Sequence, residues 1–435
     1  MAGGGPCRCR GRTLAALIWL AEGLLAVHDW PRRQRGGSAV KDGGGAAVWL
    51  LAVGQTLIYA GCYYSFPALL PDLEAATGWG KATLALGPTL GFLIMAGLTV
   101  FTGRLVDKGL GGEMLIWGPV LAAFGVLGLA VAPSPSVWLL SWALIGVAQA
   151  GCLYETCFAF LTRRLGDGAR AAITRVTLVA GFAGTLAFPL GHWVGAVWGG
   201  QGGMLVFAAL CLLAVPCNIW AVRSLRRRER VGASNAPTPP GTLQAALRKP
   251  AFWIIAAGFT AIYLNHGVLL TYVLVLFADR GAAPGIAALA AASIGPAQVA
   301  GRLVLLGLGA RVSTGQATKV AAGGIVVASV VLWLAGVAPV LIFAFALAQG
   351  AGAGLMSILR PVLIAEVLGR SGFGVISGAV AVAPILAAAA APSVGAGLLA
   401  LGGPDLVYAV CLALAALGLA LVILLLARKP DPFAG

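Results

Sequence analysis

The stretch TVFTGRLVDKGLGG, residues 99 to 112, ends a long apolar run with a short turn that carries Arg104, Asp107 and Lys108. Apolar runs of this kind recur from about residue 46 to residue 427. A helix of about 20 apolar residues covers the roughly 30 Å of hydrocarbon in a bilayer. The runs are continuous and do not alternate as barrel strands do, so they predict membrane-spanning helices.

The composition agrees with a membrane protein. Of the 435 residues, 60% are hydrophobic and only 10% are charged, and the mean hydropathy is +0.95. A soluble domain carries about 25% charged residues. We therefore predict an all-α, polytopic membrane protein with twelve transmembrane helices, at about 46–71, 81–103, 112–132, 136–162, 171–196, 203–224, 251–278, 284–308, 317–336, 339–367, 372–402 and 404–427.

The distribution of charge predicts the orientation in the membrane. The net charge is +15, yet the predicted outer loops hold only two basic residues, Lys81 and Arg280. The positive-inside rule then places both termini in the cytoplasm of a cell inner membrane or plasma membrane. The basic excess is explained by this topology and by contact with anionic lipid, so we expect no nucleic-acid partner.

The chain divides into two similar halves. The segments LGPTLGF and IGPAQVAG place Gly87 and Gly295 at matching positions, 208 residues apart. Such parallel repeats form two pseudo-symmetric six-helix bundles that can rock about a central site. We predict an N-terminal bundle at 46–224, a basic cytoplasmic linker rich in Pro and Gly at 225–250, a C-terminal bundle at 251–427 and a cytoplasmic tail at 428–435.

Residues 1–45 do not fit this plan. They begin with basic residues and continue into an apolar stretch, from Thr13 to Val27, that is too short to span comfortably. A signal-like segment, an interfacial helix and translated sequence ahead of the natural start all remain open. We expect this extension to lie outside the functional core.

The charged turn is the first candidate for a functional element. An aspartate beside bases at one helix end can dock on a neighbouring helix end, and glycines let the backbones approach. The turn resembles the loop Gly-x-Leu-x-Asp-(Arg/Lys)-x-Gly-Arg of the major facilitator superfamily. The matching residues are Gly103, Leu105, Asp107 and Lys108, whereas Leu110 and Gly111 replace the final Gly-Arg. The resemblance implies a major facilitator fold and a conformational latch formed by Gly103, Arg104, Asp107 and Lys108.

A finer resemblance, to bacterial relatives of the monocarboxylate porter branch, lies in SIGPAQVAGRLVL. That branch carries Asp-x-x-x-Arg on this helix, where this chain has Gln298 and Arg302. Animal monocarboxylate porters have a lysine after the Phe-Pro of the first helix, where this chain has Ala68. The resemblance implies transport of an organic anion such as a carboxylate, and both departures argue against proton-coupled lactate transport.

Arg302 is the leading candidate for substrate binding. A charge inside hydrocarbon costs at least about 2.5–3.5 kcal/mol, so it needs a reason to be there. Gln298 lies four residues earlier on the same helical face, and the two can bind a carboxylate together. The alternative is an arginine that reaches the membrane surface or braces a neighbouring helix.

Glu155 and Arg360 are a second candidate pair. They lie 205 residues apart, close to the repeat offset, and therefore at comparable depths of the fourth and tenth predicted helices. The family resemblance implies that these helices line the central cavity. We interpret the pair as a gate, or Glu155 as a carrier of a coupling proton. A static structural pair is the alternative.

Three further residues complete the predicted substrate site. His266 and Asn265 lie near the middle of the seventh predicted helix, and Tyr63 lies in the first. The resemblance to the bacterial relatives implies that the histidine faces the substrate. A buried neutral histidine and tyrosines that only pack remain alternatives.

These features together predict a secondary active transporter for a small organic solute, in which a proton is the expected coupling ion and the functional unit is a monomer in the lipid bilayer. The alternatives are efflux of drugs or metalloid compounds by proton antiport and, in another class, a membrane sensor that does not transport. The three histidines and scattered acids supply no catalytic or metal set, so we expect neither an enzyme nor a cofactor. No cysteine pair has zinc or redox spacing.

Overall fold

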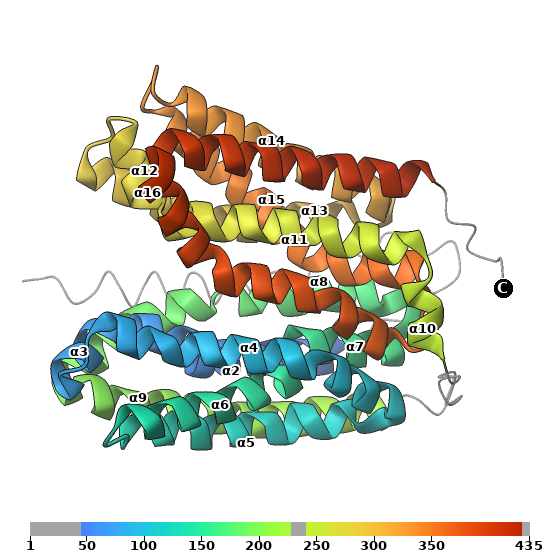
Figure 1. Ribbon diagram of the computed structural model, residues 1–435. Helices are drawn as coiled ribbons and strands as arrows, with labels where there is room; N and C mark the ends of the chain where they lie inside the picture. The colour runs from blue at the N-terminus through green and yellow to red at the C-terminus, as the bar shows by residue number, and fades with distance from the viewer. Residues whose placement is uncertain (1–44, 228–240, 429–435) are drawn as a thin grey trace, which may run out of the picture. The chain divides into compact units, whose positions relative to one another are not determined.

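The computed structural model describes residues 45–227 and 241–428, here called the first half and the second half, and every regular element in these two ranges is helical (Figure 1). The predictions for residues 1–44 of the N-terminal extension, for residues 228–240 of the linker and for residues 429–435 of the tail concern residues outside these ranges. The helices of the first half are α2 (Gly45–Tyr59), α3 (Ser65–Thr77), α4 (Lys81–Leu105), α5 (Gly111–Ala130), α6 (Pro135–Cys152), α7 (Tyr154–Leu165), α8 (Ala169–Ala180) and α9 (Ala183–Arg227). Those of the second half are α10 (Thr242–Leu247), α11 (Pro250–Thr271), α12 (Val273–Asp279), α13 (Pro284–Leu308), α14 (Thr314–Leu334), α15 (Leu341–Val367) and α16 (Phe373–Ala427).

Glycines divide the longest helices into separate membrane crossings. Helix α9 has 45 residues and α16 has 55, lengths of about 68 and 83 Å at 1.5 Å per residue, against about 30 Å of hydrocarbon. Helix α9 breaks at Gly199, where φ is 69°, and α16 breaks at Gly402 and Gly403. A positive φ favours glycine because a side chain would clash with the backbone there. Each of these helices therefore turns back through the membrane.

The described residues hold eight continuous helical stretches that are long and apolar enough to cross a bilayer. Two of these stretches, Thr83–Ala130 and Phe373–Ala427, each contain two of the predicted crossings, and Pro135–Arg227 contains three. Each of the other five contains one. The eight stretches therefore hold the twelve crossings that the apolar runs predict, and the all-α membrane fold is confirmed.

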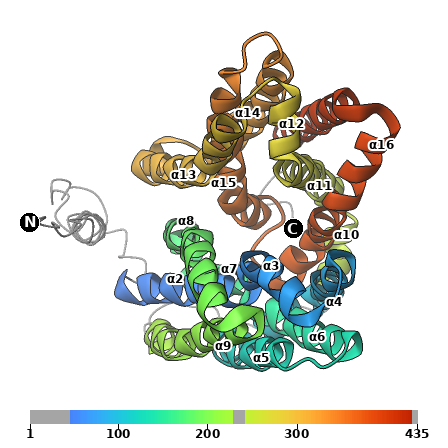
Figure 2. The ribbon, with the colours of Figure 1, turned by 90° about the vertical axis from the view of Figure 1, so that its left-hand side faces the viewer.

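Within each half, the helices pack mainly on one another. In the first half, α2, α3 and α5 pack on α9, and α4 packs on α6. In the second half, α11 packs on α16, and α13 and α14 pack on α15. Figure 2 shows the blue and green helices of the first half on one side and the yellow to red helices of the second half on the other. The halves meet where α16 contacts α4 and α7, and where α8 contacts α13 and α15.

The apolar core shows where the halves are joined. One cluster of buried side chains draws on both halves, with Val48, Phe158 and Ile173 from the first and Phe252 and Ile376 from the second. This shared cluster lies at the end of the bundle that carries α10, Arg163, Arg226 and Arg370, here called the basic end. Toward the opposite end, the buried residues form one cluster in the first half and a separate cluster in the second. The halves are therefore closed against each other at the basic end.

Candidate functional site

Asp107 links the two halves at the basic end. It lies in the π-helical turn Val106–Leu110 that follows α4, and its side chain is buried. Its two carboxylate oxygens accept hydrogen bonds from the backbone N–H groups of Gly374 and Val375, at 2.9 and 2.8 Å. These groups belong to the first turn of α16, where N–H groups lack partners within the helix and the helix dipole is positive. A carboxylate of the first half therefore caps a helix of the second half.

Gly103 makes this contact possible. It lies one turn before Asp107, and its backbone is pressed against the backbone of Gly374. A Cβ atom at residue 103 would collide with the carbonyl oxygen of Gly374. The close approach of α4 and α16 therefore requires a residue without a side chain at this crossing.

The other two predicted latch residues, Arg104 and Lys108, do not take part in the contact with α16. Both side chains are exposed, and neither forms a hydrogen bond or an ion pair with any of the described residues. The base that joins the turn is Arg163 of α7, which donates a hydrogen bond to the backbone carbonyl of Asp107. Arg163 was missed because no sequence spacing relates it to residue 107.

Glu155 of α7 and Arg360 of α15 form an ion pair between the halves. Their side chains are only 11% and 6% exposed, so this pair is largely removed from water. The guanidinium of Arg360 also lies 5.3 Å from the ring centre of Tyr263 on α11. The structure thus brings together the two residues that the repeat offset relates.

A cavity of about 130 Å³ adjoins this ion pair. It receives side chains from both halves, among them Tyr59, Tyr63 and Tyr154 from the first half and Tyr263 and Pro384 from the second. Tyr63 lies in the π-helical segment Ala60–Tyr64, a type of bulge that often occurs at functional sites. The predicted residue Tyr63 therefore lies beside the predicted gate, in a pocket that contains four tyrosines, here called the aromatic pocket.

Arg302 of α13 is buried between the halves, at 5% exposure. Its Nη1 donates to the backbone carbonyl of Thr177 on α8, at 2.8 Å, and its Nε donates to the carbonyl of Gly354 on α15, at 3.2 Å. Its Nη2 lies 3.5 Å from Oε1 of the predicted partner Gln298 and 3.4 Å from the hydroxyl of Ser357. All these partners are neutral, and no carboxylate of the described residues forms an ion pair with Arg302.

Arg302 also lies near the aromatic pocket. A Cβ atom on Gly181 would collide with Nη1 of Arg302, and a Cβ atom on Gly184, three residues later, would contact the ring of Tyr64. The ring of Tyr64 in turn lies 5.0 Å from that of the pocket residue Tyr63. The region therefore contains the neutralised pair Glu155–Arg360 and, nearby, one buried positive charge without a counter-ion among the described residues. A buried cation in this state favours a negatively charged ligand.

Asn265 and His266 belong to a hydrogen-bond network inside the second half. Asn265 is fully buried and donates to the carbonyl of Cys411 at 2.7 Å and to the hydroxyl of Ser329 at 3.2 Å. Gln349 of α15 donates to the side-chain oxygen of Asn265 at 3.0 Å and lies 3.3 Å from Nδ1 of His266. Neither residue lines the pocket beside Tyr63. The amide of Asn265 is thus occupied by protein partners, and the network was missed because it depends on Gln349, 84 residues away.

Two more contacts join the halves at the basic end. Asp167, which follows α7, forms an exposed ion pair with Arg370 at 2.6 Å. Arg170 of α8 donates two hydrogen bonds, both at 3.2 Å, to the carbonyl of Val312. No motif in the sequence pointed to these residues, although Asp167 and Arg370 lie 203 positions apart, close to the repeat offset.

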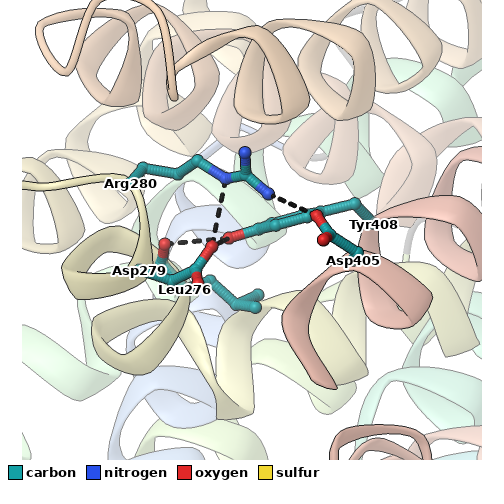
Figure 3. Close-up of polar contacts among 5 residues, drawn as sticks. All are labelled: Leu276, Asp279, Arg280, Asp405 and Tyr408. Atoms are coloured by element: carbon teal, nitrogen blue, oxygen red, sulfur yellow. Dashed lines mark hydrogen bonds and ion pairs between the residues drawn. The ribbon is translucent and has the colours of Figure 1, made fainter. Parts of the chain in front are cut away.

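A further ionic cluster lies toward the opposite end, but it joins residues of the second half only (Figure 3). Arg280 follows α12 and lies 3.9 Å from the ring centre of Tyr408. It contacts Asp279 at 3.3 Å and Asp405 at 3.0 Å, and the Tyr408 hydroxyl donates to Leu276 and Asp279. The cluster ties α12 to the last crossing of α16 without holding the two halves together.

The residues 45–227 and 241–428 contain no group of three histidine, cysteine or acidic side chains placed to hold a metal ion.

A sequence model of the Major Facilitator Superfamily matches residues 51–383. The chain belongs to the major facilitator superfamily. Members of the superfamily are transporters and not enzymes, and the eight apolar stretches of the described residues agree with a multi-pass membrane protein.

Known structures of the superfamily share this fold. A bacterial homologue of the iron transporter ferroportin, described as outward-facing, superposes with a TM-score of 0.70 at 18% identity and covers 88% of this chain and 100% of its own. FucP, in a structure described as the outward conformation, has a TM-score of 0.67 at 14% identity, over 87% and 99% of the two chains. Identities this low show a common fold and do not show a common substrate.

Relatives by sequence are only partly matched. The multidrug resistance protein MdtH of Edwardsiella ictaluri is 26% identical over 248 residues, or 54% of this chain and 58% of that protein. An uncharacterized 38 kDa protein of Thermoproteus tenax is 30% identical over 148 residues, or 33% of this chain and 38% of that protein. The chain therefore spans between about two fifths and three fifths of these relatives. None of the four proteins named here is described as a monocarboxylate porter.

Proposed function

We propose that this superfamily member is a secondary active transporter for a small organic anion and that Arg302 binds the anion's charge. The observation that carries the proposal is the buried guanidinium of Arg302, which touches both halves and has only neutral partners among residues 45–227 and 241–428. A carboxylate could displace the weak contacts to Gln298 and Ser357, at 3.5 and 3.4 Å, and form a charge-assisted bond instead. The resemblance to bacterial relatives of the monocarboxylate porter branch supports the same class of substrate.

In this proposal, Glu155 and Arg360 form the gate beneath the aromatic pocket. A proton on Glu155 would remove the charge that holds Arg360 and loosen the contact between α7 and α15. Protonation and substrate binding would then act on neighbouring parts of one interface. This arrangement supports a proton as the coupling ion and a monomer as the working unit.

We further propose that the basic end faces the cytoplasm. The positive-inside rule supports this orientation, because Arg163, Arg226 and Arg370 all lie at that end. A protein closed at its cytoplasmic end is in an outward-facing conformation, the state in which the two structural relatives are described. Transport would then require the Asp107 latch to open and the opposite end to close.

The direct test is a transport assay with the purified protein in proteoliposomes. A thermal-shift screen of monocarboxylates, dicarboxylates, amino acids and cationic drugs first selects a ligand. Uptake or exchange of that ligand is then measured for Arg302→Gln, Arg302→Lys and the control Lys319→Gln, whose side chain is exposed on α14. We expect the screen to select an anionic ligand. Arg302→Gln should reduce its transport by at least about 100-fold, because a buried charged contact is worth about 3 kcal/mol. The control should change transport little. Normal transport of an anion by Arg302→Gln would rule out Arg302 as its binding residue.

Orientation is tested separately by labelling introduced cysteines with a reagent that does not cross membranes. Gln244→Cys, on α10, should be labelled only after the cytoplasmic side is opened, and Ser136→Cys, at the start of α6, should be labelled in intact cells. The reverse pattern would invert the proposed topology. The binding role of Arg302 does not depend on this result.

Drug efflux is the second candidate. It is supported by the similarity to MdtH and by the aromatic pocket of Tyr59, Tyr63, Tyr154 and Tyr263, which suits a flat apolar or cationic ligand. This candidate predicts stabilisation by cationic drugs instead of anions. It also predicts that Tyr63→Ala weakens binding more than Arg302→Gln does.

A further inference from the structure

An apolar groove of about 530 Å³ lies on the outside of the first half, between α4, α5 and α6. Phe101 of α4 and Trp117 and Phe124 of α5 line it, and each of these side chains is more than half exposed. The groove lies on the side of α4 away from α16, because Thr99 and Gly103 on the other side make the contacts with that helix. It is therefore separate from the interface between the halves and from the proposed substrate site.

Two positive side chains mark the basic end of this groove. Arg104 and Lys108 follow Phe101 by three and seven positions, and they lie on either side of Leu105, the last residue of α4 that lines the groove, with Lys108 in the π-helical turn after the helix. Both are exposed, and neither is paired with a described residue. The acid at the start of α5, Glu113, is already paired with Arg226 at 2.5 Å. The groove thus ends at two positive charges without partners among the described residues.

The length of the groove corresponds to one leaflet of a bilayer. Its lining on α5 runs from Met114 to Phe124, a rise of about 15 Å at 1.5 Å per residue. The hydrocarbon core is roughly 30 Å thick, so the groove reaches about from the headgroup level to the bilayer centre. The charges at one end and the apolar walls along the rest have the arrangement of a phospholipid with an anionic headgroup.

We propose that the groove holds an acyl chain of an anionic phospholipid whose phosphate is bound by Arg104 and Lys108. Arginine and lysine are the usual side chains that bind phosphate, and a bound chain would cover Phe101, Trp117 and Phe124. This site gives a role to the two basic residues of the turn that do not contact α16. It requires neither the proposed substrate nor the proposed orientation.

Native mass spectrometry of the intact protein in detergent tests this site, with titrations of phosphatidylglycerol and of phosphatidylcholine. The unmodified protein should bind one phosphatidylglycerol more tightly than phosphatidylcholine. The double variant Arg104→Gln/Lys108→Gln should lose at least about tenfold in affinity for the first phosphatidylglycerol. The matched control Arg311→Gln/Lys319→Gln removes two exposed charges from the same end of the second half and should retain that affinity.

A second variant tests the apolar part of the site. Val147→Trp, on α6, places a large side chain in the groove from its exposed rim and leaves both charges intact. This variant should also lower the affinity of the protein for the first phosphatidylglycerol molecule. Equal losses in the double variant and its matched control would overturn the proposal, since binding would then follow net charge alone. An unchanged affinity for Val147→Trp would overturn the assignment of the acyl chain to the groove.

Discussion

The carboxylate of Asp107 in the first half caps the first turn of α16 in the second half through the backbone N–H groups of Gly374 and Val375. Hydrogen bonds to a charged group contribute about 1.5–3 kcal/mol each, more than ordinary surface contacts do. This cap is one of several contacts that close the basic end, together with Glu155–Arg360 and Asp167–Arg370. The balance between the conformations of the transporter should therefore respond to single changes at these contacts.

Asp107→Ala should shift the protein toward conformations that are open at the basic end. Loss of about 2 kcal/mol corresponds to a change of about 30-fold in the conformational equilibrium. Spin labels on Ala171→Cys and Lys319→Cys, one in each half near the basic end, should report a longer distance by pulsed electron paramagnetic resonance. Asp405→Ala removes an acid that contacts Arg280 within the second half, and this control should leave the distance unchanged. An unchanged distance in Asp107→Ala would mean that the cap does not hold the halves together.

Gly103→Val should prevent the basic end from closing. The added side chain would occupy the space of the Gly374 carbonyl, which belongs to backbone and cannot rotate away. We expect loss of transport with a protein that still folds, because each half has its own core. Gly97→Ala on the same helix is the matched control, since a Cβ atom there meets no other atom within 4 Å. Transport at the normal rate by Gly103→Val would contradict the close crossing of α4 and α16.

Arg360→Met should destabilise this conformation far more than Arg370→Met. Removing one partner of a buried ion pair leaves an uncompensated charge and costs about 3–5 kcal/mol. The Asp167–Arg370 pair, whose side chains are 96% and 51% exposed, should contribute less than about 1 kcal/mol. Thermal unfolding in detergent measures the difference, and the double variant Glu155→Gln/Arg360→Met should recover much of the stability. Equal melting temperatures for the two single variants would show that water reaches the Glu155–Arg360 pair.

Glu155→Gln should reduce the dependence of transport on pH. In the proposal Glu155 carries the coupling proton, and the amide of glutamine cannot carry it. Transport by the unmodified protein and by the variant is compared in proteoliposomes from pH 5.5 to about 8.5, with a proton gradient and without one. A pH profile that is the same in both proteins would exclude Glu155 as the coupling group, and the static ion pair would remain.

The latch illustrates what the sequence could and could not predict. The spacing of glycines and charges from residue 99 to residue 112 predicts a turn that docks on another helix, and Gly103 and Asp107 do contact α16. Arg104 and Lys108 point elsewhere, and the base that joins the turn comes from α7. Four residues close together in a turn face different directions, and only the position of α16 decides which of them meet it.

The proposed substrate site also combines features that the sequence predicts with features that only the tertiary structure decides. The cost of a charge in hydrocarbon points to Arg302, Glu155 and Arg360, and the repeat offset relates the last two, which form an ion pair in the structure. Asn265 was included for its place near the middle of a predicted crossing beside His266, but its amide is satisfied by Cys411, Ser329 and Gln349. Polar residues in hydrocarbon are rare for one physical reason, the loss of water, but protein partners satisfy that need as well as a substrate does.

The sequence by itself determined the membrane class, the twelve apolar crossings, the twofold repeat and the sign of charge at the basic end, since hydropathy and charge act along the chain. Only the tertiary structure decided that this end is closed and that Arg302 bridges the halves through the neutral carbonyl groups of Thr177 and Gly354. It also decided that Asp107 is the charged residue of the turn that caps α16. Hydrogen bonds and ion pairs form between atoms that folding brings within about 3 Å, and residues far apart in the chain carry no local signal of that distance.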